Sequence, residues 1–225
     1  MCGIFGFITK NGAGPDVDAL RRIAVETQTR GMHAFGLAWL VDGRIETFKR
    51  PGAASTNLAD LDRCQGATIV VGHCRYATHG HPSDNRNNHP HRAGKGWICH
   101  NGVVHNHDSL AWLHDLAPMT DCDTEVLGLL IGRLRGPLGT RAARAAEEAD
   151  GELAILGLWR RPDRLLIVRN GKPLSYAGTR EGYYFASLDR ELPGRPRHVP
   201  DQQVSVATFA SGRLSEVSYP IDPRV

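Results

Sequence analysis

The sequence predicts an α+β domain in which helices pack on antiparallel sheets. Short apolar and β-branched segments occupy both ends of the chain, and most of the helical periodicity lies between them, from residue 108 to residue 149. Glycine, proline or aspartate separates one segment from the next. Strands that come before and after a block of helices favour an α+β layer design over alternating βαβ units.

The composition is that of a globular protein. With 225 residues, 41% of them hydrophobic and 23% charged, the chain can bury a full core, as one large domain or as two small ones. No repeat or linker interrupts it, so we predict one domain over residues 1–225. No apolar run approaches the roughly 18 residues of a membrane span, and the apolar segment at residues 3–8 is too short for a signal peptide. We therefore expect a cytoplasmic protein with no membrane partner.

Charge and cysteine content argue against two further classes. The formal net charge is only +3, and the basic residues are spread over the whole length, so we expect no nucleic-acid partner. Five cysteines, an odd number without C-x-x-C spacing, argue against a disulfide framework and against a structural zinc knuckle.

Periodicity and turn residues predict the elements in order. Up to residue 100 we expect a strand at residues 4–8, a helix at 16–27, a hairpin of 35–41 and 44–48, and strands at 67–72 and 97–99. Beyond it we expect helices at 108–113, 123–134 and 140–149, and strands at 152–159, 165–169, 174–177, 183–187, 204–209 and 213–217. Residues 81–96 are expected to be one long loop that covers or lines a site, and residues 192–200 a surface loop.

The second residue would combine two reactive groups once the initiator methionine is removed. Cys2 would then carry a thiol nucleophile and a free α-amine. An α-amine with a pKa of roughly 7.7–8.0 is partly neutral near cytosolic pH and can accept the thiol proton. A cysteine at this position can equally be an ordinary residue, so its role depends on the rest of the sequence.

Three later segments carry candidate functional residues. The nonapeptide GHCRYATHG, at residues 72–80, is dense in functional side chains. Asn101-Gly102, after an expected strand, can turn two N–H groups to one side as an oxyanion hole, or can form a plain type I′ turn. Asp123 is expected to cap the helix that follows it, and a carboxylate at such a corner can also hold a substrate amine.

Together these motifs resemble one enzyme family. CGI from residue 2, GHCRYATHG, NHPH, HNGVVHNH and DCDTEV occur in order and at plausible spacing. They resemble the class II glutamine amidotransferases, N-terminal-nucleophile hydrolases found as the glutaminase domains of glucosamine-6-phosphate synthase and amidophosphoribosyltransferase. NGKPL and FASLD extend the resemblance over nearly the whole chain. The resemblance implies a four-layer αββα sandwich of two antiparallel sheets flanked by helices, with no cofactor and no metal.

The resemblance also implies a role for each site residue. Cys2 attacks the side-chain amide carbon of glutamine, and water then hydrolyses the γ-glutamyl thioester after ammonia has left. The side chain of Asn101 and the N–H of Gly102 form the oxyanion hole. Arg75 binds the α-carboxylate, and Asp123 binds the α-ammonium group. The segment that closes over glutamine contributes Tyr76, Thr78 and His79.

Two departures from the family pattern matter. His33 stands where the family often has an aspartate, so charge pairing at that position is an open question. No synthase or transferase domain follows in these 225 residues, so the sequence does not identify the ammonia acceptor. We expect a separate acceptor protein, and the sequence does not indicate an oligomeric state.

Three other hypotheses remain open. The same site could hydrolyse a γ-glutamyl amide other than glutamine, because Arg75 and Asp123 would contact only the glutamyl end. A non-catalytic binding module would keep the pocket without turnover, and retained Met1 would acylate the amine and silence the site. Zinc could bind to H-x-H pairs, because alternate residues of a strand lie on one face. These pairs are His79 and His81, His89 and His91, and His105 and His107.

Overall fold

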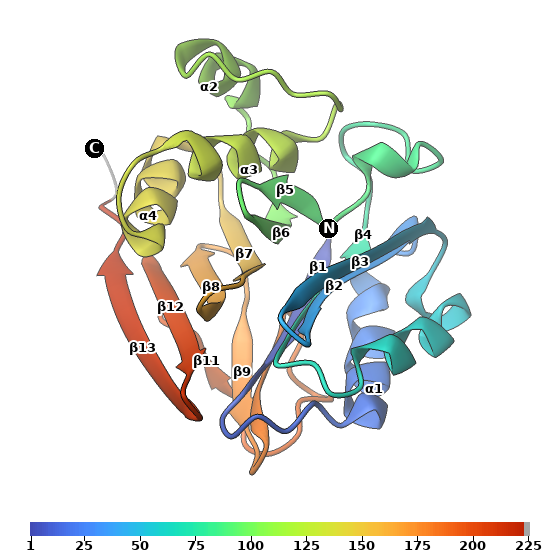
Figure 1. The fold of residues 1–225 in the computed structure, drawn as a ribbon. Coiled ribbons are helices and arrows are strands. Elements are labelled where there is room, and N and C mark those ends of the chain that lie inside the picture. The colour runs from blue at the N-terminus through green and yellow to red at the C-terminus, as the bar shows by residue number, and fades with distance from the viewer. Residues whose placement is uncertain (223–225) are drawn as a thin grey trace.

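A computed structural model describes residues 1–222, whose main elements are arranged in four layers (Figure 1). The helices are α1 (Val17–Thr27), α2 (His107–Leu113), α3 (Asp123–Arg133) and α4 (Leu138–Glu148). The strands are β1 (Gly3–Thr9), β2 (Ala34–Val41), β3 (Arg44–Pro51), β4 (Ile69–Arg75), β5 (His91–Ala93), β6 (Gly96–Gly102), β7 (Leu153–Trp159), β8 (Asp163–Asn170), β9 (Ser175–Gly178), β10 (Gly182–Ala186), β11 (Arg197–His198), β12 (Gln203–Ala210) and β13 (Arg213–Pro220). Short 3-10 helices are η1 (Gln28–Arg30), η2 (Ala54–Thr56), η3 (Leu58–Cys64) and η4 (Asn85–Asn87).

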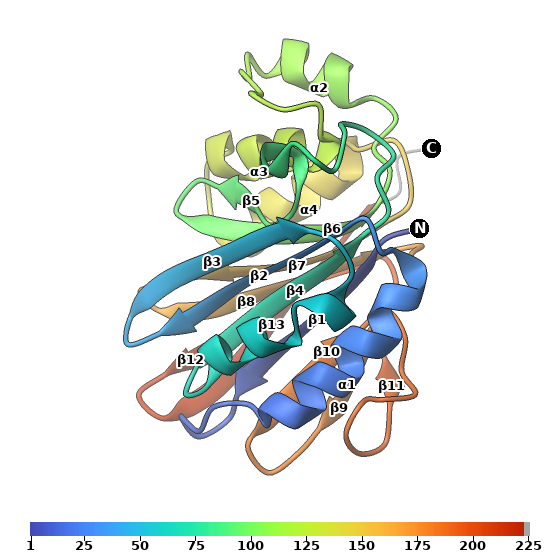
Figure 2. The same ribbon diagram turned by 90° about the vertical axis from the view of Figure 1, so that its right-hand side faces the viewer.

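Two antiparallel sheets form the inner layers. One has the strand order β11-β9-β10-β1-β4-β2-β3, and the other has the order β13-β12-β8-β7-β6-β5. Figure 2 shows both sheets between α1 on one side and α2, α3 and α4 on the other. In the first sheet Gly3 of β1 pairs with Cys74 of β4, so the start of β1 and the end of β4 lie at the same end of the strands.

The alternation of side chains along β1 explains the layers. Ile4 and Ile8 point towards the second sheet, where they join a buried cluster with Leu156. Phe5 and Phe7 point the other way, into a cluster formed with α1. Because both faces of β1 are covered, all seven of its residues are buried, and each large apolar side chain contributes about 1.5–3 kcal/mol on burial.

The outer helices cover the sheets with apolar faces. Leu20 and Ile23 of α1 are fully buried against the first sheet, and Asp16 caps this helix by accepting a hydrogen bond from the Asp18 N–H at 2.9 Å. Leu127 and Leu130 of α3 pack in the cluster that covers the second sheet. Among the described residues, no helix is long and apolar enough to cross a membrane.

The predicted fold class is confirmed, and four local expectations need correction. The expected loop at 81–96 contains η4 and the strand β5, and the loop at 192–200 contains the two-residue strand β11. Helix α2 begins at His107, one residue before the expected start, with Asn106 at its N-cap. The N-cap of α3 is Cys122, and Asp123 is already its first helical residue.

Candidate active site

Cys2 lies directly before β1, and three contacts fix its position. Its Sγ lies 3.3 Å from both the backbone nitrogen and the backbone oxygen of Tyr76, the residue after β4. Its carbonyl oxygen accepts a hydrogen bond from Arg30 Nε at 2.8 Å. Ile4, the second residue of β1, donates its N–H to Ser187 Oγ at 3.0 Å. The FASLD motif therefore supports the strand that carries the thiol.

A cavity of about 580 Å³ opens beside the Cys2 side chain. Five of the residues predicted from the sequence line it, namely Cys2, Tyr76, Thr78, Asn101 and Gly102. Cys2, Tyr76 and Thr78 lie where β1 begins and β4 ends in the first sheet. Asn101 and Gly102 are the last residues of β6 in the second sheet. The fold thus brings segments that lie about a hundred residues apart into one cavity.

The end of β6 offers a free hydrogen-bond donor to this cavity. Asn101 is only 1% exposed, and its Nδ2 has no hydrogen-bond partner within residues 1–222. A buried donor without an acceptor costs about 1–3 kcal/mol, so an incoming oxygen would satisfy it. Gly102 has φ of +154°, and a Cβ there would lie 2.3 Å from the Glu152 carbonyl oxygen. Only glycine fits at this position. The stretch is the end of strand β6 and not a type I′ turn.

Burial keeps the Cys2 thiol protonated. Burial is the largest influence and raises the pKa of Cys2 above its ordinary value. The Tyr76 N–H and the positive charge of Arg75 act in the opposite direction, while the Asp123 carboxylate raises the pKa further. The thiol therefore needs a base if it is to act as a nucleophile.

Arg75, the last residue of β4, lies behind the cavity and does not line it. Its guanidinium donates to Asn88 Oδ1 at 2.8 Å, to the Gly80 carbonyl oxygen at 3.0 Å and to the His79 carbonyl oxygen. Asn88 is completely buried, and its Nδ2 donates in turn to the Pro82 carbonyl oxygen at 2.8 Å. The amide of Asn88 thereby orients the guanidinium, a role that the sequence did not reveal.

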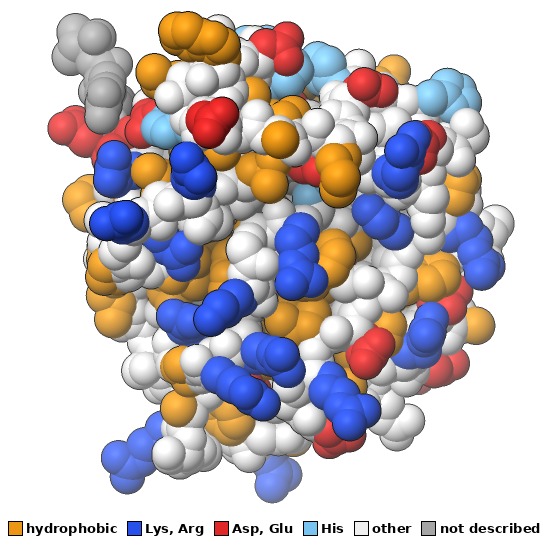
Figure 3. Space-filling view, turned by 45° about the horizontal axis from the view of Figure 1, so that its top comes forward, with side chains coloured by type: hydrophobic (Ala, Val, Ile, Leu, Met, Phe, Trp, Pro, Cys, Tyr) orange, Lys and Arg blue, Asp and Glu red, His pale blue; other side chains and the backbone are white. Residues whose placement is uncertain are grey.

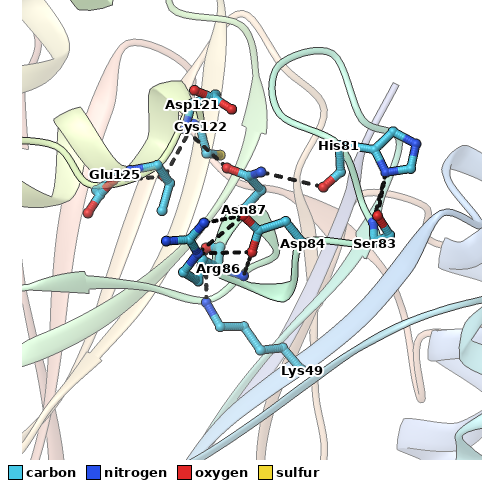
Figure 4. Close-up of polar contacts among 10 residues, drawn as sticks. Lys49, His81, Ser83, Asp84, Arg86, Asn87, Asp121, Cys122 and Glu125 are labelled. Atoms are coloured by element: carbon cyan, nitrogen blue, oxygen red, sulfur yellow. Dashed lines mark hydrogen bonds and ion pairs between the residues drawn. The ribbon is translucent and has the colours of Figure 1, made fainter.

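Hydrogen bonds near its C-terminal end hold the segment between β4 and β5 in place, as Figure 4 shows. Asn87 Oδ1 accepts a hydrogen bond from the Asp121 N–H at 3.1 Å, just before α3. Lys49 Nζ, from β3, donates to the carbonyl oxygens of Asn88 at 2.7 Å and Arg86 at 3.3 Å. The predicted covering loop is therefore held by contacts from both sides of the sandwich.

Asp123 is buried at the start of α3, also behind the cavity. Its Oδ2 accepts a hydrogen bond from the Val104 N–H at 2.8 Å, and its Oδ1 accepts one from the Thr124 N–H at 2.9 Å. The carboxylate thus ties the residues after β6 to α3, and the helix N-terminus stabilises its charge.

His33 contacts Tyr76 and its neighbour Ala77, whereas His79 packs elsewhere. His33 Nδ1 accepts a hydrogen bond from the Ala77 N–H at 3.0 Å, and its ring stacks on Tyr76 at 4.9 Å between centroids. An imidazole nitrogen therefore supplies the acceptor that an aspartate would supply, without a charge pair. His79 does not line the cavity but packs against His107, with 5.1 Å between the ring centroids.

Four buried histidines pack under the site between β4, β5, β6 and α3. His73 Nε2 donates to the His100 carbonyl oxygen at 3.0 Å, which connects β4 to β6. Thr124 Oγ1 lies 2.8 Å from His89 Nε2 and 3.0 Å from His100 Nδ1. Burial lowers the pKa of all four, that of His91 to about 3, so these rings are neutral at physiological pH.

Only one group of side chains among the described residues has the spacing that a zinc site requires. His89, His91 and Cys122 place ligand atoms within 4.8 Å of one another, and neither of the other H-x-H pairs joins such a group within the described part of the chain. Zinc would require loss of the Cys122 proton, whereas burial raises the pKa of that thiol to about 12. Metal analysis of untagged protein tests this group directly.

One wall of the cavity was not predicted from the sequence. Beyond Asn101 and Gly102 this wall contains His105, Asp150, Glu152 and Lys172. Lys172 Nζ and Glu152 Oε2 form an ion pair at 2.7 Å. The NGKPL motif, which includes Lys172, was the one available signal, and nothing in its spacing pointed to this contact.

Known proteins share both the sequence and the fold. The sequence profile of a glutamine amidotransferase domain matches residues 73–193, more than half of the chain. The glutamine–fructose-6-phosphate aminotransferase (isomerizing) of Chlorobaculum tepidum is 32% identical over 229 aligned residues, which cover 92% of this chain and 36% of that protein. The corresponding enzyme of Methanosarcina acetivorans is 32% identical over 244 residues, covering 100% of this chain and 38% of that protein.

The chain therefore spans little more than a third of the length of these relatives. Among solved structures, glutamine phosphoribosylpyrophosphate amidotransferase from B. subtilis superposes with a TM-score of 0.80 at 22% identity, over 100% of this chain and 50% of that one. Its similarity identifies the fold as that of the N-terminal-nucleophile hydrolases. With the profile match and the N-terminal Cys2, the chain belongs to the class II glutamine amidotransferase family.

Proposed function

We propose that this protein, after removal of Met1, hydrolyses the side-chain amide of glutamine to glutamate and ammonia with Cys2 as the nucleophile. One observation carries the proposal. The Cys2 thiol shares a cavity with the buried and unpartnered Nδ2 of Asn101. Acyl transfer requires at least a nucleophile and a hydrogen-bond donor for the oxyanion, on residues that line the same cavity.

The first step transfers one proton and forms one bond. The α-amine of Cys2 takes the thiol proton, directly or through a water, and Sγ attacks the amide carbon of glutamine. The carbonyl oxygen becomes an oxyanion, which Asn101 Nδ2 and the Gly102 N–H stabilise. Each such donor lowers the activation barrier by about 3 kcal/mol, because it interacts most strongly with the charge of the transition state.

The second step releases ammonia and the third regenerates the thiol. The tetrahedral intermediate collapses, the C–N bond breaks, and the α-ammonium returns its proton to the leaving amine. A γ-glutamyl thioester remains on Cys2. Water attacks this thioester with the α-amine as base, the same oxyanion hole is used again, and the C–S bond breaks to give glutamate.

Recognition of the amino-acid end falls to Arg75 and Asp123. The Arg75 guanidinium is occupied by two backbone carbonyls of the segment after β4. A carboxylate binds a guanidinium more strongly than a neutral carbonyl does, so the substrate α-carboxylate replaces these contacts as the segment adjusts. Asp123 keeps acceptor capacity beside its two backbone N–H bonds and receives the α-ammonium group.

The test measures glutamate and ammonia together, using protein whose N-terminus has been verified by mass as Cys2. We expect equal amounts of both products, complete loss in Cys2→Ala, and retained turnover in Cys64→Ala, which removes a thiol buried under α1. Unchanged turnover in Cys2→Ala would refute the proposal. So would inactivity of the verified protein towards glutamine and every γ-glutamyl amide.

A second candidate is a hydrolase for another γ-glutamyl amide. The cavity extends past the oxyanion donors to His105 and to the Glu152–Lys172 ion pair. Ammonia needs none of these groups, whereas a larger amine substituent would contact them. A higher kcat/KM for an N-substituted γ-glutamyl amide than for glutamine would favour this candidate, and the opposite order would favour glutamine.

The destination of the ammonia belongs to another domain or protein. The described helices and strands all belong to the αββα sandwich, and the relatives from C. tepidum and M. acetivorans are named for transfer to fructose 6-phosphate. We infer that an acceptor domain or protein outside the described sandwich consumes the ammonia here. Stimulation of glutamine hydrolysis by a co-purifying synthase, with ammonia retained in the complex, is the expected result.

A further inference from the structure

A second cavity, of about 780 Å³, lies away from the Cys2 site on the helix-covered side of the second sheet. Six of the residues that line it are basic, namely Arg92, Lys95, Arg141, Arg160, Arg161 and Arg164. No carboxylate lines it. Figure 3 shows Lys and Arg side chains gathered across the middle of one face of the molecule, with most carboxylates towards its rim.

The fold brings these six residues together from four places. They come from β5, the turn before β6, the first half of α4, and the β7–β8 hairpin. Gly132 at the end of α3 packs against Gly94 in the β5–β6 turn, where a Cβ on Gly132 would lie 2.8 Å from the Gly94 nitrogen. This close packing sets the β5–β6 turn against the end of α3, so the basic side chains converge on one fixed hollow.

The six charges have no carboxylate partner within residues 1–222, although the Arg92 guanidinium lies over the Trp97 ring, 5.4 Å from its centroid. None of them forms an ion pair with a carboxylate. Three of them donate to backbone carbonyls only: Arg92 to Gly94, Arg141 to Ile131, and Arg160 to Gly43.

Two guanidinium groups in the cavity also hold unsatisfied donors. The Nε atoms of Arg141 and Arg164 are buried and have no acceptor in the described part of the chain. Burial, and then the nearby charge of Arg164, lower the pKa of Arg141. Convergent like charges with buried, unused N–H groups are unfavourable unless an anion joins them.

We propose that this cavity binds a small molecule that carries two or more phosphate groups. Guanidinium groups bind phosphate oxygens through two parallel hydrogen bonds, and five arginines offer more such pairs than one phosphate can use. The volume lies in the range of about 300–1,000 Å³ that small-molecule sites occupy. A cavity lined by six basic side chains suits a small polyanion better than an extended acidic segment of a protein.

Calorimetric titration of the full chain with sodium pyrophosphate and tripolyphosphate, at constant ionic strength, tests the proposal. We expect saturable binding, tighter for tripolyphosphate than for inorganic phosphate, and at least a tenfold loss of affinity in Arg160→Gln/Arg164→Gln. Arg144→Gln is the matched control, because Arg144 is exposed on α4 and does not line the cavity. Thermal melting confirms that each variant folds, and Arg160→Gln alone serves if the double variant does not.

Three results would overturn the proposal. Wild type and the cavity variants could bind pyrophosphate equally, or sulfate at the same ionic strength could bind as well as pyrophosphate. The protein could also ignore every phosphate compound and bind a poly-glutamate peptide through the same arginines, which would identify the cavity as a protein-docking surface.

Discussion

The Cys2 thiol accepts a hydrogen bond from the Tyr76 N–H and donates its own proton towards the Tyr76 carbonyl oxygen, both at 3.3 Å. The resting thiol is therefore held by the backbone of one residue, which can orient its proton but cannot remove it. Burial also raises the pKa of the Cys2 thiol. In the proposed mechanism the thiol is activated by the α-amine, which Cys2 gains when Met1 is removed.

The pH dependence of turnover follows from this arrangement. Below the pKa of the free α-amine, about 7.7–8.0, the amine is protonated and cannot accept the thiol proton. We expect kcat/KM to rise about tenfold per pH unit below that pKa and to level off above it. A pH–rate profile between pH 6 and 9 checks this. A cleavable extension before Cys2 should abolish turnover until it is removed, and an active extended protein would contradict the amine as base.

Asn101→Ala should lower kcat by about 10²–10³-fold, because one oxyanion donor is lost. KM should change less than about threefold, since the ground-state amide gains little from this donor. Steady-state kinetics with glutamine measures both. Asn106→Ala is the control from the same motif, because Asn106 Nδ2 donates to the Glu148 carbonyl oxygen outside the cavity. Equal losses of kcat in both variants would contradict the assignment.

Asn88→Ala should raise KM for glutamine at least tenfold with a smaller effect on kcat. The substitution removes the acceptor that orients the Arg75 guanidinium, and a hydrogen bond to a charged group contributes about 1.5–3 kcal/mol. Asn88→Asp keeps an acceptor and should recover most of the affinity. A fall in kcat without a change in KM would assign Asn88 to another role.

His33→Asp should retain turnover within about threefold of the wild type, because a carboxylate can also accept the Ala77 N–H. His33→Phe keeps the ring that stacks on Tyr76 but loses the acceptor, which costs about 1 kcal/mol. We expect about a fivefold loss of kcat/KM in this variant. Higher activity of His33→Phe than of His33→Asp would show that the ring, and not its nitrogen, is what matters.

Stability should fall steeply in mild acid because four buried histidines are neutral in the folded state. Their folded pKa values lie below the ordinary value near 6.5, so the unfolded chain binds more protons once the pH drops below 6.5. Each ring then lowers the free energy of unfolding by about 1.4 kcal/mol per pH unit, down to its folded pKa. Urea titrations from pH 7 to 5 measure the slope. His91→Gln should reduce the slope by about 1.4 kcal/mol per pH unit, which is the contribution of one bound proton. An unchanged slope would contradict the assignment of this pH dependence to the buried histidines.

Much of the fold was predictable because local signals agree with the tertiary structure. The helix expected at 16–27 is α1, which begins one residue later with Asp16 as its N-cap, and the strand expected at 4–8 is β1. Strand β5 was missed because three residues with a polar centre show no periodicity. It exists because Arg92 pairs with Trp97 and because α3 packs against it at Gly128.

The candidate site was only partly visible for a related reason. Motifs in the sequence pointed to Cys2 and Asn101, yet no spacing indicates that Asp123 turns from its own helix to the Val104 N–H. Likewise, the contact between Lys172 and Glu152 joins segments twenty residues apart across a turn and a strand pair. Such contacts depend on strand order, which local patterns do not specify.

The two halves of the cavity belong to different sheets, and an imidazole spans the gap between them. His73 Nε2 on β4 donates to the carbonyl oxygen of His100, the residue directly before Asn101. The remaining contacts between the sheets are mainly apolar and non-directional, so this hydrogen bond helps to fix how one sheet is aligned with the other. In the proposed mechanism, His73 therefore helps to align Cys2 with Asn101, although it does not line the cavity. We expect turnover to be lost when the sheets shift relative to each other, even in molecules whose secondary structure is intact.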